Sequence, residues 1–123
     1  MKIFLSIAAV LAWLFGAALI LAPAGFYAPT GITMTPLLAT VAQAHGATLV
    51  GLGVVDWMSR AATGASARAV LAGNLVVQIL SLGVVLRTMS LGAGAAVAPG
   101  VVIHVVLGGL FAFFLVRARR AQS

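Results

Sequence analysis

Long apolar runs limit what this chain can fold into more than any other feature of its sequence. Four such runs, separated by short segments rich in small and polar residues, approach or reach the roughly 20 residues that an α-helix needs to cross a bilayer. Hydrophobic residues make up 63% of the 123 residues and charged residues only 7%, which is far from the composition of soluble domains. The sequence therefore predicts a single all-α transmembrane domain covering residues 1–123.

The order and charge of the segments predict the topology. The predicted spans cover residues 3–22, 37–58, 69–87 and 99–116. Their short connections predict an up-down-up-down four-helix bundle. Most cations would lie on one side of the membrane and only Arg87 on the other, and those on the first side are Lys2, Arg60, Arg68, Arg117, Arg119 and Arg120. By the positive-inside rule, both termini are expected in the cytoplasm.

The second run contains the only acidic residue of the chain, Asp56. An ionisable residue at membrane depth is costly and is a candidate for function, such as carrying a proton or a cation. Arg60 follows four residues later, in the favourable acid-before-base order on a helix. Since a buried carboxylate must be paired or neutralised, we expect a structural ion pair between Asp56 and Arg60.

The two histidines, His45 and His104, would lie in the outer halves of the second and fourth spans and could face each other. Gly100 and Gly108 stand one turn to either side of His104, which leaves room for a planar macrocycle, and transmembrane histidines can ligate haem or chlorophyll-type pigments. A neutral histidine bonded to a neighbouring helix would produce the same pattern. We favour this second interpretation, so the sequence leaves the cofactor unknown.

The remaining polar and small residues indicate helix packing. Asn74, Gln78 and Ser81 share one face of the third span and are expected to form bonds between helices. Glycines allow close approach of helices in a membrane. The glycines expected to do so are Gly46, Gly51, Gly53, Gly100 and Gly108.

Several classes of function are disfavoured by what the sequence lacks. There is no cysteine and no second carboxylate, so thiol chemistry and a carboxylate pair are excluded. No glycine-rich phosphate loop, no nucleophile with a partnering base and no metal-ligand spacing is present, so we do not expect an enzyme or a metal site. The net charge of +6 comes from helix ends, where membrane topology explains it more simply than nucleic acid does.

Three segments carry a resemblance to known proteins. They are HGATLVGLGVVDWMSR (45–60), ARAVLAGNLVVQILSL (67–82) and VVIHVVLGGLFAFFL (101–115). Together they resemble a group of small four-helix bacterial inner-membrane proteins of unknown function, similar in broad outline to DoxX-like proteins. The resemblance implies a bacterial inner-membrane location and no particular activity.

The features together favour a small structural or accessory subunit within a larger membrane assembly. Its expected partners are the lipid bilayer and either other membrane subunits or further copies of itself. One alternative is a haem- or pigment-binding redox or photosynthetic subunit that uses His45 and His104. A second alternative is a small transporter that uses the polar face of the third span.

Overall fold

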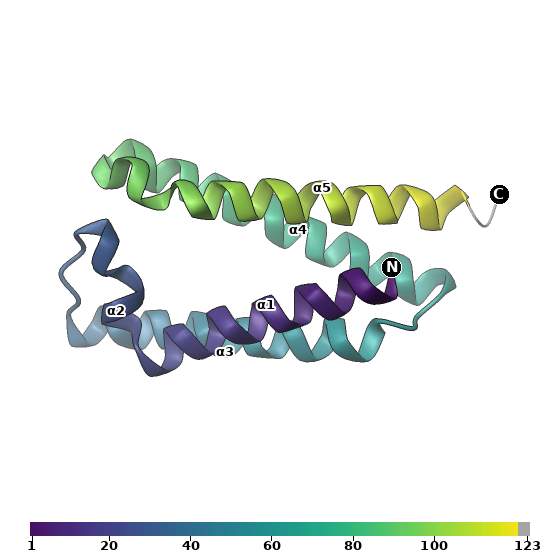
Figure 1. Cartoon of the computed structure of the whole chain (residues 1–123), viewed down its shortest axis with the longest axis horizontal. Helices are drawn as coiled ribbons and strands as arrows, with labels where there is room; N and C mark the ends of the chain where they lie inside the picture. Colours follow the sequence, from purple (N-terminus) through teal and green to yellow (C-terminus); the bar gives the residue numbers. More distant parts are fainter. Residues whose placement is uncertain (121–123) are drawn as a thin grey trace. The chain divides into compact units, whose positions relative to one another are not determined.

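The computed structural model describes residues 1–120, which form helices joined by short connections without any strand (Figure 1). Three stretches of this part of the chain are long and apolar enough to cross a membrane: Lys2–Leu21, Pro36–Ser59 and Gly64–Arg120. The prediction of an all-helical chain is thus confirmed, and these stretches support its assignment to a membrane. The chain divides into two compact units, Met1–Ala61 and Ala62–Ser123. The single domain predicted over residues 1–123 stays a prediction.

The first unit contains two long helices that run side by side in opposite directions (Figure 1). Its elements are α1 (Lys2–Leu21), α2 (Pro23–Tyr27), η1 (Ala28–Thr30) and α3 (Pro36–Ser59). Pro23 ends α1 because it has no N–H to continue the hydrogen-bond ladder, and it then occupies the first turn of α2. At the start of α3, Leu38 N donates to Thr35 Oγ1 over 3.2 Å, and this bond caps the helix.

The segment between α1 and α3 contains the short helices α2 and η1. Phe26 packs edge-on against Phe15 of α1, with 6.0 Å between ring centroids. Thr30 Oγ1 donates to the carbonyl oxygen of Tyr27 over 2.7 Å. These local contacts supply backbone and side-chain partners that Pro and Gly content alone does not indicate.

Small residues bring α1 and α3 close together. A Cβ added to Gly46 would lie 2.7 Å from the carbonyl oxygen of Gly16, and a Cβ on Gly16 would lie 2.7 Å from that of Gly46. The buried positions of α1 recur at helical spacing: Phe4, Leu5, Ala8, Ala9, Ala12, Gly16 and Leu19. Without a β-carbon at either glycine, the two backbones meet directly, as in other membrane helix pairs with small residues at the contact.

The second unit also pairs two long antiparallel helices (Figure 1). Its elements are α4 (Gly64–Thr88), η2 (Met89–Ala93), η3 (Gly94–Val97) and α5 (Ala98–Arg120). The chain reverses at Gly92 and Gly94, whose φ angles of 112° and 55° suit glycine rather than residues with a β-carbon.

Both helices of the second unit are longer than the spans predicted at 69–87 and 99–116. The connection between α3 and α4 is short, since α3 ends at Ser59 and α4 begins at Gly64. The physical reason is that the apolar run marks only the part of a helix inside the hydrocarbon. Ala67 and Arg68 favour helix, and Pro99 lies in the first turn of α5, where proline is tolerated, so the helices continue beyond the apolar run.

Candidate functional site

A polar contact joins the two helices of the second unit. His104 Nδ1 of α5 lies 2.8 Å from Gln78 Oε1 of α4. Because the amide oxygen accepts, the imidazole donates from Nδ1. Gln78 is buried, with 7% of its surface exposed, so the bond lies inside the helix pair. In membrane proteins such a bond contributes about 0.6 kcal/mol on average.

Gly100 and Gly108 of α5 lie on the side that faces α4. A Cβ added to Gly108 would be 3.4 Å from Gln78 Cβ, and one added to Gly100 would be 3.5 Å from the nearest Val85 methyl carbon. Both distances are ordinary van der Waals contacts, so this helix pair leaves room for an extra methyl group. The approach is therefore looser than the one between α1 and α3.

The other polar residues of α4 lie in two different settings. Asn74 is buried, and its Nδ2 donates to the carbonyl oxygen of Val70 in the same helix over 3.1 Å. Ser81 is half-buried. Asn74 and Gln78 thus share the buried face of α4, and Gln78 provides the bond to α5 described above.

The two histidines lie in different units and different surroundings. His45 is exposed on α3, whereas His104 is half-buried beside Gln78. The structure defines each of the two units separately, so a site that uses both histidines stays a prediction. Among residues 1–120, no group of three or more His, Cys, Asp or Glu side chains lies together in a way that could hold a metal ion.

The cytoplasmic end predicted for α3 contains a cation and aromatic cluster. The Arg60 guanidinium carbon lies 4.2 Å from the centroid of the Trp57 ring, and Arg60 Nη1 donates to the Trp57 carbonyl oxygen. Asp56, one residue earlier, is buried with only 1% of its surface exposed. The contacts of Arg60 are thus with Trp57, and its expected ion pair with Asp56 stays a prediction.

This cluster extends to α1 through a second tryptophan. The rings of Trp13 and Trp57 lie 5.6 Å apart between centroids, inclined at 44°. A Cβ on Gly53 would lie 2.6 Å from the Trp13 ring, so Gly53 provides the space that the indole occupies. Sequence reasoning missed the contact between α1 and this cluster. The three-residue spacing of Trp57 and Arg60 was a visible signal, but the position of Trp13 depends on how the two helices are aligned.

A second contact that the sequence did not reveal lies near the other end of this helix pair. Gln43 Nε2 donates to the carbonyl oxygen of Ile20 over 3.1 Å. That carbonyl is in the last turn of α1, where backbone oxygens lack partners within the helix. The bond therefore completes the end of α1 and ties it to α3.

Small residues form two strips along α3, and these strips differ in how exposed they are. Ala42, Gly46 and Gly53 are buried, and the two glycines contact α1. The second strip, formed by Ala44, Ala47 and Gly51, is exposed. A Cβ added to Gly51 would meet nothing within 4 Å. The strip with Gly46 and Gly53 thus packs within the first unit, and the strip with Gly51 is exposed.

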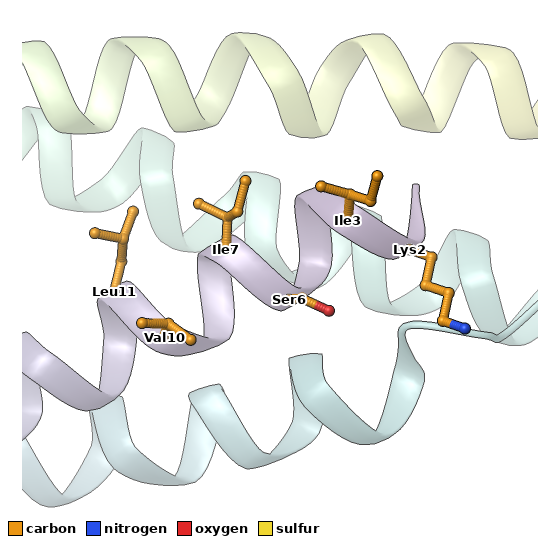
Figure 2. A pocket seen from close by; sticks show the side chains of 6 residues that line it. All are labelled: Lys2, Ile3, Ser6, Ile7, Val10 and Leu11. Carbon is orange, nitrogen blue, oxygen red and sulfur yellow. The ribbon is translucent and has the colours of Figure 1, made fainter.

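Residues of α1 line a hollow whose described lining is mostly apolar (Figure 2). Lys2 and Ser6 supply its only polar side chains, at the end nearest the start of the helix. The lining residues are Lys2, Ile3, Ser6, Ile7, Val10 and Leu11. They offer an apolar surface. They do not form the set of converging polar groups that a small-molecule site would also need.

Comparison with known proteins gives no match: no family model, no curated protein and no solved structure is significantly similar to this chain. The resemblance to small four-helix inner-membrane proteins with a DoxX-like outline therefore stays a prediction. Any functional conclusion depends on the helix contacts and polar groups described above.

Proposed function

We propose that this chain is a four-span protein of the bacterial inner membrane, with both termini in the cytoplasm, that acts as a structural or accessory subunit. It would do so by binding the helices of other membrane subunits or of further copies of itself. The spans are α1, α3, α4 and α5, arranged up-down-up-down. Six cations at one set of helix ends, against one at the other, support this orientation.

The exposed strip of α3 is the observation that carries the proposal. Lipid chains give no reason for Ala44, Ala47 and Gly51 to be small, because large apolar side chains face lipid equally well. The exposed His45 is a further polar group at membrane depth on the same helix. Polar residues in such positions normally face protein or a water-filled cavity rather than lipid. A partner helix would satisfy both features.

The test compares two open glycines in different surroundings. Gly51→Leu fills the exposed strip of α3. Gly109→Leu is the matched control, because Gly109 also has nothing within 4 Å but is flanked one turn away by the exposed Val105 and Phe113. Both variants should fold, since a Cβ at either position meets nothing within 4 Å.

The measurement is cross-linking in native membranes followed by gentle solubilisation and sizing. We expect wild-type protein and Gly109→Leu to be recovered in a larger assembly, and Gly51→Leu to be recovered mainly alone. Recovery of the wild type only as a monomer, before and after solubilisation, would refute the proposal. Equal assembly of all three proteins would refute the role of the α3 strip.

A further inference from the structure

The end of α5 presents an unusual concentration of positive charge. Arg117, Arg119 and Arg120 all lie in the last turn of the helix, and all three side chains are exposed. A fourth arginine, Arg68, lies in the second turn of the partner helix α4 and is half-buried.

The alignment of the two helices brings these arginines to one end of the second unit. Gln78 faces Gly108 and Val85 faces Gly100, so residue numbers fall along α4 as they rise along α5. Continuing this alignment by about ten residues sets Arg68 level with Arg117 along the helix axes. Figure 1 shows the same arrangement, with the start of α4 and the yellow end of α5 at one end of the helix pair.

Positive charge is concentrated at this end of the second unit. The guanidinium groups of Arg117, Arg119 and Arg120 are exposed within one helical turn and form a surface that attracts anions. Guanidinium groups bind phosphate oxygens through paired hydrogen bonds, which makes phosphate the best-matched anionic group.

Exposed apolar side chains directly before the arginines indicate which class of phosphate compound this surface would bind. Phe113 and Val116 are 56% and 47% exposed, and Phe113 packs edge-on against Phe114 with 5.2 Å between ring centroids. An exposed aromatic and aliphatic surface followed by cations matches the boundary between acyl chains and headgroups. A soluble phosphate compound or a nucleic acid would have no use for the apolar part.

We propose that this basic end of the second unit, formed by Arg68, Arg117, Arg119 and Arg120, binds the headgroups of anionic phospholipids. Phe113 and Val116 would contact the adjoining acyl chains. The inference rests on the membrane location in the proposed function but not on binding to other helices. Each cation near an anionic membrane surface strengthens association about fivefold, so loss of three arginines should weaken it about a hundredfold.

The experiment measures lipid binding to the purified full chain in neutral detergent by native mass spectrometry. Phosphatidylglycerol is titrated against phosphatidylcholine with the same acyl chains. Three variants are compared with the wild type: the triple change R117Q/R119Q/R120Q, the charge-preserving R117K/R119K/R120K, and R87Q. R87Q is the matched control because it removes an exposed arginine from the opposite end of the same unit. Circular dichroism checks that each variant keeps its helical content.

We expect the wild type, R87Q and the lysine variant to prefer phosphatidylglycerol, and the glutamine variant to bind it about a hundredfold more weakly. Equal binding of both lipids by the wild type, or unchanged binding by the glutamine variant, would overturn the proposal. So would an equal loss in R87Q. The lysine variant keeps the charges but lacks the paired guanidinium bonds, so a partial loss is expected there. Displacement of the lipid by equimolar glycerol phosphate or by a short DNA strand would show that the surface binds soluble anions instead. Failure here with intact helix-mediated assembly would leave the proposed function standing.

Discussion

Gly46→Ala tests how far the contact between α1 and α3 depends on the absence of a β-carbon. The new Cβ would lie 2.7 Å from Gly16 O, 2.9 Å from Ile20 Cγ1 and 3.0 Å from Leu19 Cβ. Reaching the 3.4 Å of ordinary contact with the carbonyl oxygen requires the helices to separate by about 0.7 Å. Overpacking of this kind costs about 1 to 3 kcal/mol.

Gly51→Ala on the same helix is the control, because a Cβ there meets nothing within 4 Å. Both variants gain the higher helix propensity of alanine, up to about 1 kcal/mol in water. The difference between their free energies of unfolding therefore isolates the contact itself. We expect Gly46→Ala to be less stable than Gly51→Ala by about 1 to 3 kcal/mol.

Steric trapping in neutral bicelles measures this difference. The chain has no native cysteine, so biotin labels can be attached to cysteines introduced at one exposed position on each helix. Streptavidin then captures the separated helices, and the free energy of unfolding follows from its binding. Values for the two variants that agree within about 0.5 kcal/mol would refute the reasoning.

Four further predictions concern the second unit and the topology. A double-mutant cycle of Gln78→Leu and His104→Ala should give a coupling free energy of about 0.6 kcal/mol by the same trapping method, and zero coupling would contradict the observed bond. Wild-type protein from haem-competent cells should be colourless, whereas a visible absorption band lost in His104→Ala would establish a ligand role for that histidine. Gly108→Ala should be tolerated, since its Cβ would make an ordinary 3.4 Å contact, while Gly108→Leu should lose about 1 to 3 kcal/mol of stability; equal stabilities would place Gly108 away from the helix contact. Reporter fusions after Arg60 and Arg87 should report cytoplasm and exterior respectively, and any other result would reject the proposed orientation.

The positions of the long helices could be predicted from the sequence with errors of a few residues. The first predicted span, 3–22, corresponds to α1 at Lys2–Leu21, and the second, 37–58, to α3 at Pro36–Ser59. Apolar runs identify such helices because the hydrocarbon thickness fixes their length. The helix ends were less predictable, as at Arg120, because polar residues outside the hydrocarbon can continue a helix as readily as a loop.

The choice of contacting faces could not be predicted in the same way. Two strips of small residues run along α3, and both satisfy the spacing expected for close packing. The structure uses the strip with Gly46 and leaves the strip with Gly51 open. In a soluble helix the apolar side would decide the matter, but α3 is apolar on most sides, so hydrophobicity does not distinguish them.

For the candidate polar groups, the sequence indicated which residues would form contacts but not which partners they would contact. That His104 would bond to a neighbouring helix was a prediction from the cost of a polar group in lipid. That its partner is Gln78 depends on the alignment of α4 with α5, which spacing within one helix does not encode. The stacking of Arg60 on Trp57 likewise depends on side-chain rotation.

The two units of this protein differ in their fluorescent residues. Trp13, Trp57 and Tyr27 are the only tryptophan and tyrosine residues of the chain, and all lie before Ala62. The second unit has only phenylalanine as a chromophore, so excitation near 295 nm reports solely on the surroundings of α1 and α3. Separation of the rings from their 5.6 Å spacing would shift this emission. Comparing this emission with the loss of helical circular dichroism of the whole chain would therefore give the order in which the two units lose structure, without any attached dye.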